Sequence, residues 1–543
     1  MPASGRQNSA ERLGEVFKHG AWGSDIISGF LVFLIALPLS LGVAVASGFP
    51  PMAGVLSAII GGLLVSRING SALTVVGPAA GLIVVIFASV QALGQGDNLA
   101  GYRYTLAAIV LSGVLQFVLG YFKAGRLAAF FPASVVHGML AAIGIIIIVK
   151  QLPAMLGIQL ETPDNMLLAI WQLLRAQAFF VPRIGLIALF GLCILMGWPQ
   201  LKNPLPKIIP APLLVIVVGM GLGYLFNLAE FSPDALFNLP PDIDIGGPYL
   251  VSIPDSLAAA IVLPDFAKLT SPVFWQSVIS ICLVGSLETL LSTAAVDKLD
   301  PQKRYSDLNK DLQAMGIGNT LSGMIGGLPM IAEIVRSSAN IDYGARSGWS
   351  NFYHGGFLLL FVILFPWLIA RIPLASLAAL LVYIGYKLAS PRAFARTLDL
   401  GKEQLYIFAV TIVGILISNL LVGVMLGIVA KLLVHLVRGV PFRNLLSISY
   451  RMEQVATDNY RLKIDGSAIF SNFIALKSQL ATLPQGKTIV FDLADVYLID
   501  HTVMEFINAF RRDYILQGGD CEILGLDDHA VAGNHDLAAR IKQ

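Results

Sequence analysis

Charged residues are scarce in this chain. Asp, Glu, Lys and Arg make up 13% of its 543 residues, whereas soluble domains average about 25%. Hydrophobic residues make up 56%, and the mean hydropathy is +0.76. This balance excludes an ordinary soluble protein and indicates a polytopic membrane protein.

Cysteine is also rare, and no motif of enzyme chemistry is present. Of the three cysteines, Cys193 and Cys282 lie in apolar segments and Cys521 lies in a polar tail, so we expect no disulfides. The formal net charge is only +2, which gives no indication of a nucleic-acid partner. Without a phosphate-binding loop, metal-ligand spacing or catalytic triad, we expect neither an enzyme nor a cofactor.

Long apolar segments define the predicted membrane region. A spanning helix needs roughly 20 apolar residues. Fourteen candidates are centred near Ile35, Ile59, Val84, Leu111, Ile145, Leu189, Val217, Leu283, Gly318, Ile334, Val362, Leu380, Val413 and Met425. The segments after Pro78 and Pro329 hold about a dozen helical residues, or about 18 Å, too short to cross alone. We therefore predict an all-α polytopic fold with 14 transmembrane segments.

The placement of charge predicts the orientation. The first 25 residues are polar and lack the layout of a cleavable signal. With this end in the cytosol, the basic loops 298–310 and 387–402 fall inside, and segment 227–271 with its five aspartates falls outside. We predict a multi-pass protein of the bacterial inner membrane with both termini cytosolic.

The composition changes after about Arg438. The polar tail contains expected strands and one amphipathic helix, at 461–470, 488–493, 501–514 and 521–526. Strands alternating with helices favour a small α/β domain. The predicted organisation is a cytosolic N-terminal segment (1–25), a transmembrane transporter domain (26–438) and a cytosolic domain (439–543).

A weak internal repeat relates the two halves of the membrane region. A Pro-containing helix at 37–40 precedes 75–81, which opens a short helix. The helix with Glu288 precedes 326–329, which opens another. Seven crossings per half give the two copies opposite orientations. Interrupted helices at matching positions point to the binding site of a transporter.

The starts of the two short helices form a candidate anion site. Each helix N-terminus offers unpaired N–H groups and about half a positive charge, which suits an anion. Gly77, Ala79 and Ala80 are small enough to let an ion approach the backbone amides. Pro78 has no N–H group, and in the first turn of a helix that group would lack a partner within the helix in any case. The alternative is a Gly-Pro break that serves only helix packing.

Ionisable residues within apolar segments are costly and usually mark an ion pathway or a binding site. Glu288 and Ser292 are four residues apart and share one helical face. A desolvated carboxylate holds a proton more readily, and an ionised one shares a sodium ion with hydroxyl and carbonyl oxygens. We predict that this pair binds the coupling ion, Na⁺ or H⁺. The alternative is a structural carboxylate.

Arg336 is the candidate cation of the substrate site. Its guanidinium would attract an anion, with Ser337 beside it. Glu333, three residues earlier, lies on the same side of the predicted helix and pairs with Arg336 in the alternative, purely structural interpretation. Asn340 is expected to fasten this helix to a neighbour.

The order of these motifs resembles the SulP family of inorganic anion transporters. The resemblance rests on Val-Gly-Pro-Ala-Ala at 76–80, Gly-Ser-Leu-Glu-Thr-Leu-Leu-Ser at 285–292, the segment 309–319, Gly-Gly-Leu-Pro at 326–329 and Arg-Ser-Ser-Ala-Asn at 336–340. The tail, with Asp-His-Thr at 500–502, resembles a STAS domain. The resemblance covers nearly the whole chain.

The resemblance implies a fold of seven plus seven inverted segments, split into core and gate domains, with substrate between the third and tenth segments. It implies elevator-type alternating access and a homodimer. Family substrates include sulfate, bicarbonate, chloride and some dicarboxylates, with coupling to sodium or protons in bacterial members. Glu288 and Ser292 match the spacing of a carboxylate and a hydroxyl in sodium-coupled bicarbonate members.

Two departures from the family pattern affect the choice of substrate. Residues 37–42 lack the polar Gln or Glu found after the proline in many members, which weakens the case for proton coupling there. Glu333 stands where many relatives have a small residue, and a second carboxylate near the site would either exclude a dianion or hold a cation or proton beside it. The prediction is secondary active transport of bicarbonate first and sulfate next. The alternatives are an uncoupled anion exchanger or channel, and a dicarboxylate transporter.

Thr502 corresponds, through the resemblance, to the position phosphorylated in anti-sigma antagonists. A phosphate at a helix N-terminus is favourable, but a plain helix cap is the preferred interpretation. The tail is expected to dimerise or to regulate, and a membrane sensor that signals to a cytosolic protein partner is the remaining alternative.

Overall fold

The structure of the chain is a computed structural model. It describes residues 22–125, 131–158, 169–172, 175, 180–202, 209–230, 249–254, 256–456, 459–473, 476, 480, 486–516 and 518–542. The predicted N-terminal segment lies almost wholly outside these residues, as does most of the acidic segment between 227 and 255. The described chain forms two compact units, one of residues 22–125 and 143–387 and one of residues 131–142 and 388–542.

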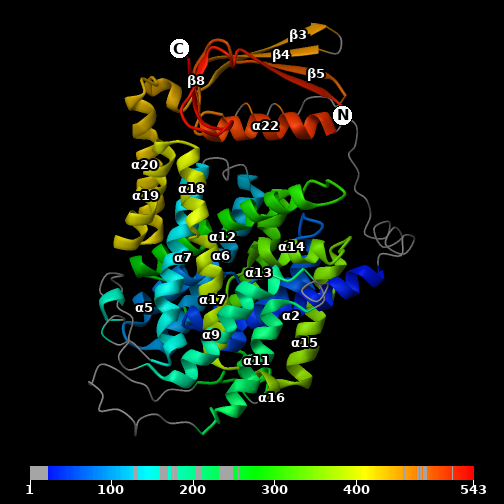
Figure 1. Cartoon of the computed structure of the whole chain (residues 1–543), viewed down its shortest axis with the longest axis vertical. Coiled ribbons are helices and arrows are strands. Elements are labelled where there is room, and N and C mark those ends of the chain that lie inside the picture. The colour runs from blue at the N-terminus through cyan, green and yellow to red at the C-terminus, as the bar shows by residue number, and fades with distance from the viewer. Residues whose placement is uncertain are drawn as a thin grey trace. The chain divides into compact units, whose positions relative to one another are not determined.

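The first unit is helical apart from two short strands (Figure 1). Its helices are α2 (Trp22–Ala46), α3 (Pro51–Ile60), η1 (Gly61–Val65), α4 (Ser66–Ile68), η2 (Ala80–Leu82), α5 (Ile83–Gly94), α6 (Asn98–Tyr121), most of α7 (Ala133–Leu156), α9 (Pro182–Gly197), η5 (Trp198–Gln200), α11 (Ala211–Leu225), η6 (Ala258–Ala260), α12 (Pro272–Leu299), α13 (Leu308–Met324), α14 (Ile334–Asp342), α15 (Trp349–Leu364), α16 (Pro366–Ile369) and α17 (Leu374–Leu388). The strands are β1 (Val75–Gly77) and β2 (Ile331–Glu333).

Glycines bring the backbones of neighbouring helices into contact. A Cβ atom added at Gly113 of α6 would lie 2.5 Å from the amide nitrogen of Thr320 in α13. One added at Gly316 of α13 would lie 2.5 Å from the amide nitrogen of Phe117. Small residues at helix contacts are typical of membrane proteins, because lipid provides no hydrophobic drive for helices to associate.

Eight helical stretches in the described residues are long and apolar enough to cross a membrane. They are Trp22–Ala46, Pro51–Ile68, Asn98–Tyr121, Ala133–Leu156, Pro182–Gln200, Pro272–Leu299, Leu374–Asp399 and Leu420–Val437. Shorter apolar helices cover Ala80–Gly94, Ala211–Leu225 and Trp349–Leu364. The chain is thus a multi-pass helical membrane protein, while the count of fourteen spans stays a prediction.

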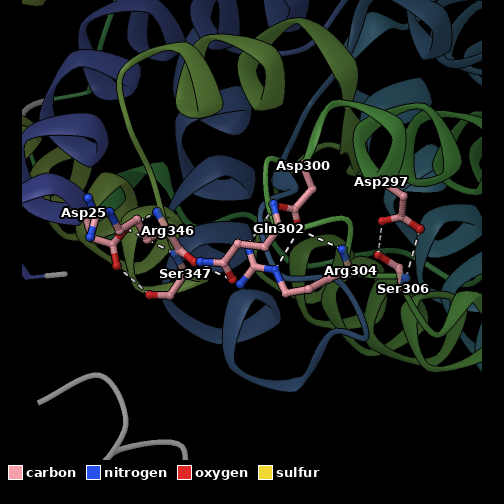
Figure 2. Close-up of polar contacts among 8 residues, drawn as sticks. All are labelled: Asp25, Asp297, Asp300, Gln302, Arg304, Ser306, Arg346 and Ser347. Atoms are coloured by element: carbon pink, nitrogen blue, oxygen red, sulfur yellow. Dashed lines mark hydrogen bonds and ion pairs between the residues drawn. The ribbon is translucent and has the colours of Figure 1, made fainter. Parts of the chain in front are cut away.

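Polar contacts fasten the first turn of α2 and two loops of the first unit together (Figure 2). The buried carboxylate of Asp25 accepts hydrogen bonds from the amides of Arg346 (2.7 Å) and Ser347 (3.2 Å). The guanidinium of Arg304 pairs with Asp300 at 2.6 Å and donates to the carbonyl oxygen of Arg346 at 2.9 Å. The loop that carries Arg304, which is predicted to be cytosolic, therefore lies beside the loop that carries Arg346.

In its described residues the second unit combines the start of α7 and the helices α18 (Pro391–Asp399), α19 (Lys402–Ile417), α20 (Leu420–Val437) and α22 (His501–Leu516) with a seven-stranded mixed sheet. The strands are β3 (Ser449–Ala456), β4 (Asn459–Ala468), β5 (Thr488–Asp492), β6 (Val496–Ile499), β7 (Asp520–Leu524), β8 (His529–Val531) and β9 (Arg540–Lys542), preceded by η7 (Phe442–Leu445). Their order is β7-β5-β4-β6-β9-β8, with β3 beside β4. Helix α22 lies along the sheet (Figure 1) and buries Val503 and Ile507 in its core.

The start of α22 differs from expectation. Asp500 caps the helix, because its Oδ1 atom accepts a hydrogen bond from the amide of Val503 at 2.8 Å. The hydroxyl of Thr502 is buried and has no hydrogen-bond partner among the described residues. The interpretation of Thr502 as the cap was therefore wrong. A carboxylate one residue before the helix reaches the third helical amide, which is the usual capping geometry.

Candidate functional site

The candidate site is built around the two short strands of the first unit. β1 pairs antiparallel with β2, with Val75 opposite Glu333 and Gly77 opposite Ile331. Both strands are buried except at Glu333. Helix α5 follows β1 through η2, and α14 follows β2 directly, so the N-terminal ends of both helices adjoin the strand pair.

The helices begin later than the sequence predicted. Pro78 lies between β1 and η2, not in the first turn of a helix, and α14 begins at Ile334, five residues after Pro329. Arg336 is consequently the third residue of α14 and lies in its first turn. The residue before a proline favours extended backbone, and the antiparallel pairing then satisfies the backbone groups that a helix would otherwise satisfy.

Arg336 is fully buried at the centre of this arrangement. Its Nη2 atom donates to the carbonyl oxygen of Pro78 at 3.1 Å, and its Nε atom forms an ion pair with Glu333. Its Nη1 atom has no hydrogen-bond partner among the described residues. A Cβ atom added at Gly77 would lie 2.5 Å from Nη1, so glycine is required for the guanidinium to rest against β1.

Ser337 holds the strand pair and α14 together. Its hydroxyl accepts a hydrogen bond from the amide of Val75 at 2.8 Å and donates to the carbonyl oxygen of Glu333 at 2.5 Å. Both contacts are to the backbone. Ser337 therefore positions β1 beside α14, in addition to any contact with substrate.

Glu288 reaches the site from α12. Its side chain lies against Gly81, where an added Cβ atom would overlap the carboxylate. Its Oε1 atom is buried without a hydrogen-bond partner among the described residues, as is the hydroxyl of the adjacent Thr289. Ser292 lies one turn away and is half-buried, and within the described chain no hydrogen bond joins it to Glu288.

Most of the predicted site residues are thus brought together. Gly77, Pro78, Glu333, Arg336 and Ser337 are joined by direct contacts, and Ala79 and Ala80 continue from Pro78 as buried residues toward Gly81. Thr502 belongs to the other unit and has no part in this cluster.

Two amide side chains that the sequence did not single out support β2. Asn319 accepts a hydrogen bond from the amide of Met330 at 2.6 Å and donates to Oε1 of Gln116 at 2.6 Å. Gln116 in turn donates to the hydroxyl of Ser286 at 3.3 Å. The sequence could have indicated Gln116, because an amide side chain within the apolar segment 98–121 needs a hydrogen-bond partner when it is buried.

Asn340 fastens α14 to its surroundings, as predicted. Its Nδ2 atom donates to the carbonyl oxygen of Leu73 at 3.2 Å and to the hydroxyl of Ser350 at 2.9 Å. Its Oδ1 atom accepts from the hydroxyl of Ser28 at 2.6 Å. α14 is therefore tied to the segment before β1 and to α2 and α15.

The charges of the site are unbalanced. The buried cluster holds one guanidinium, Arg336, and two carboxylates, Glu288 and Glu333. With both carboxylates ionised, the site lacks one positive charge even before an anion enters. A proton or a cation at Glu288 would supply it, and uncompensated charge in a dry interior is costly.

Comparisons with known proteins indicate the family to which the chain is related. A model of the sulfate permease family matches residues 23–411. The putative sulfate transporter YvdB of Bacillus subtilis is 26% identical over 510 residues, which cover 92% of this chain and 91% of YvdB. The bicarbonate transporter BicA of Picosynechococcus sp. is 24% identical over 528 residues, covering 91% of this chain and 88% of BicA.

Solved structures show the same fold. The transmembrane domain of a cyanobacterial bicarbonate transporter, BicA, matches with a TM-score of 0.60 at 24% identity, covering 76% of this chain and 97% of that one. SLC26A9 matches with a TM-score of 0.68 at 15% identity, covering 95% of this chain and 86% of that one. The second match extends over the C-terminal sheet, which is consistent with a STAS domain. With a family model matched over most of its length, the chain belongs to the sulfate permease family and is a multi-pass membrane transporter, not an enzyme.

Proposed function

We propose that this protein carries a small inorganic anion across the inner membrane by secondary active transport, with bicarbonate favoured and sulfate next. Relatives named as putative sulfate transporters and as bicarbonate transporters support an anion substrate. The second carboxylate at Glu333 supports a monoanion, because each added negative charge must be placed near a buried carboxylate.

One observation carries the proposal. Two buried polar atoms of opposite character, Arg336 Nη1 and Glu288 Oε1, have no hydrogen-bond partner among the described residues and lie beside Gly77 and Gly81 respectively. Buried polar groups are nearly always paired, so each orphan needs an explanation. An anion that accepts from Nη1 and a cation or proton that binds Oε1 would satisfy both.

The anion would rest between Arg336 and the first amides of the two helices. These amides lack acceptors within their own helix, and Ala79 and Ala80 leave the backbone accessible to a small ion. Arg336 is already in contact with Glu333 and Pro78. Arg336 therefore supplies positive potential and a single free donor, Nη1, and does not form two parallel hydrogen bonds to the anion.

The coupling ion would bind at Glu288. Sodium would take oxygen ligands from this carboxylate and a neighbouring hydroxyl, that of Ser292 as the sequence predicts or that of the unpaired Thr289. A proton would need the carboxylate alone. A cation loaded together with the anion cancels the anion's charge, so the loaded site carries no more net charge than the empty one, which lowers the cost of carrying the anion through a dry gate.

The proposal includes the wider transport scheme that family membership supports. It comprises fourteen spans in a seven-plus-seven inverted repeat, core and gate domains that move by an elevator, a homodimer, and cytosolic termini. The strand pair supports such a movement, because it joins the starts of α5 and α14 by backbone hydrogen bonds.

Flux measurements in proteoliposomes test the proposal. Labelled bicarbonate, sulfate and fumarate are each offered with and without inward gradients of sodium and of protons. Accumulation of bicarbonate that requires one of these cation gradients is the expected result. Uptake that is independent of both gradients would indicate an uncoupled exchanger or channel. Preferential uptake of fumarate would indicate a dicarboxylate transporter.

A pair of glycine substitutions makes the test specific to Glu288. In Gly81→Ala the new methyl group overlaps the Glu288 carboxylate, whereas in Gly356→Ala on α15 nothing lies within 4 Å of the added Cβ. We expect the first variant, like Glu288→Gln, to lose cation-coupled uptake, and the second to retain it. Normal gradient dependence in Gly81→Ala and Glu288→Gln would reject the assignment of the coupling ion to Glu288.

A further inference from the structure

A second cluster of cationic side chains lies in the other unit, around a cavity of about 280 Å³. Its walls come from the start of α7, from α18, from the start of α22 and from residues 535–537. This volume is near the lower limit of small-molecule sites, which are roughly 300–1,000 Å³. The cavity therefore accommodates a small ligand and no large one.

Two arginines of α18 dominate the charge of the cavity. Arg392 and Arg396 are four residues apart and both line it, so they share one face of the helix. Within the described residues neither guanidinium takes part in an ion pair or a side-chain hydrogen bond. Like charges at this spacing repel each other by a few tenths of a kcal/mol, and an anion between them removes that repulsion.

The N-terminus of α18 also adjoins the cavity. Ser390, the residue before the helix, lines the cavity and makes no side-chain hydrogen bond to the first helical amides. Helix N-termini attract anions through their unpaired amides and the helix dipole. This end of α18 therefore adds to the positive potential of the two arginines.

Contacts with the backbone of Leu537 fix the tautomers of two histidine rings in the cavity wall: in the neutral rings His535 keeps Nε2–H as a donor, whereas His501 donates from Nδ1 and keeps Nε2 as an acceptor. Nδ1 of His535 accepts a hydrogen bond from the amide of Leu537 at 3.1 Å, which leaves Nε2–H as the donor of the neutral ring. Nδ1 of His501 lies 2.7 Å from the carbonyl oxygen of Leu537 and must donate to it. His137 of α7 lines the same cavity.

One acidic side chain, Glu505 of α22, also lines the cavity. It forms no ion pair within 4.0 Å in the part of the chain that the structure describes. An ionised carboxylate only accepts hydrogen bonds, so it repels an anion that has no proton. It tolerates an anion that carries a hydroxyl, because that hydroxyl can donate to the carboxylate.

We propose that this cavity binds phosphate, as the free ion or as a monoester, with Arg392 and Arg396 on its oxygens and its hydroxyl donated to Glu505. Guanidinium groups fit phosphate oxygens with paired, charge-assisted hydrogen bonds. Inorganic phosphate keeps at least one hydroxyl near neutral pH, and a phosphate monoester, whose second pKa is about 6, keeps one in its singly ionised form; these protonated forms are the ones that Glu505 selects. Sulfate and phosphodiesters carry no such proton and are disfavoured.

Titration of the full chain in phosphatidylcholine nanodiscs tests this site. Inorganic phosphate and sulfate are titrated calorimetrically into the wild type, Arg392→Gln/Arg396→Gln and Arg451→Gln, the last being an exposed arginine of β3 outside the cavity. We expect phosphate affinity to fall by about tenfold or more in the double variant and to be unchanged in Arg451→Gln. Equal phosphate binding in all three proteins would overturn the proposal, since the binding would then reside elsewhere, for example at the transport site.

Glu505→Gln gives a change in the opposite direction, which a folding defect cannot mimic. An amide can donate to a fully ionised oxygen, so sulfate should bind more tightly and the preference for phosphate over sulfate should fall by about tenfold. An unchanged preference would overturn the role of Glu505.

Nanodiscs that contain phosphatidic acid or phosphatidylglycerol distinguish the sources of the phosphate group. Weaker binding of soluble phosphate with phosphatidic acid alone identifies a lipid monoester as an occupant, and no effect of either lipid identifies the soluble ion. Competition by phosphatidylglycerol equal to that by phosphatidic acid would contradict the requirement for a proton.

Discussion

The buried pair of Lys431 and Asp500 gives the sharpest prediction about stability. Lys431 on α20 and Asp500 before α22 are 1% and 0% exposed, and their Nζ and Oδ2 atoms lie 3.6 Å apart. Nε2 of His435 lies 3.6 Å from the same oxygen. The pair therefore links the last apolar helix of the chain to the sheet within the second unit.

The perturbation is to remove each partner separately and then both. Removing one partner of a buried ion pair lowers the free energy of unfolding by about 3–5 kcal/mol, because the charge of the other partner stays buried without compensation. For a unit of roughly 150–250 residues, each kcal/mol lowers the melting temperature by about 2–4 °C. Lys431→Met and Asp500→Asn should each lower it by about 6–20 °C, and the double variant should recover part of that loss.

The two single variants should differ in severity. Asp500 also accepts hydrogen bonds from the amides of Phe470 (2.9 Å) and Val503 (2.8 Å). In Lys431→Met these donors still compensate the carboxylate. In Asp500→Asn one amide loses its acceptor and Lys431 keeps only a 3.4 Å contact to Gln404. We expect Asp500→Asn to be the more damaging change.

The assay is heating of the full chain in detergent, with the folded fraction followed by size-exclusion chromatography. Burial alone would raise the pKa of Asp500, but the Lys431 ammonium and His435 hold that pKa below its ordinary value. The contribution is therefore fully present above the unfolded pKa of about 3.9 and is lost as the pH falls below it. Single-variant losses that simply add in the double variant, to within about 0.5 kcal/mol, would refute the coupling.

Three further predictions concern other parts of the chain. In Gly77→Ala the added Cβ, 2.5 Å from Nη1 of Arg336, should displace the guanidinium; a cost of about 1–3 kcal/mol corresponds to initial anion uptake lowered roughly 5–150-fold. Asp300→Asn removes the negative charge and replaces one of the two acceptor oxygens in the contacts of Figure 2 by a donor; it should lower the free energy of unfolding by about 1–3 kcal/mol, measured by thermal melting. Cys521 is buried and burial raises its pKa to about 11, so at neutral pH the thiol stays protonated and should react with maleimide only after denaturation, as read by mass spectrometry.

Controls for these predictions are available in the chain. Gly356→Ala should transport normally, because its added Cβ meets nothing within 4 Å. Asp495→Asn breaks an exposed pair with Lys463 and should change the stability little, because water screens such pairs. Normal uptake in Gly77→Ala, equal costs for the Asp300 and Asp495 variants, or rapid labelling of native Cys521 would each contradict the corresponding argument.

Segments with a strong local signal were predictable. The apolar segments coincide with helices such as α2, α6 and α12, and the expected strands of the tail are confirmed as β4, β5 and β7. Ionisable residues within apolar sequence identified Glu288, Glu333 and Arg336, because burying such groups without a purpose is too costly. These predictions depended on nearby residues alone.

Features that depend on distant partners were not predictable. Strands β1 and β2 have three residues each, too few for an alternating pattern, and they exist because segments 254 or more residues apart in the chain pair with each other. The same holds for Gln116 and Asn319, whose amides meet only in the folded unit. The cap of α22 at Asp500 was missed because two residues only two positions apart, Asp500 and Thr502, both suit a helix start.

The pairing of β1 with β2 also restricts how the protein can release its cargo. Within hydrocarbon no water is at hand to replace a broken backbone hydrogen bond, and each unsatisfied group costs several kcal/mol. Prising the two strands apart would expose several such groups at once, together with the Ser337 hydroxyl that bridges them. We therefore expect the strand pair to stay joined throughout transport, so that the proposed alternating access would uncover the site from one side and then the other without separating β1 from β2.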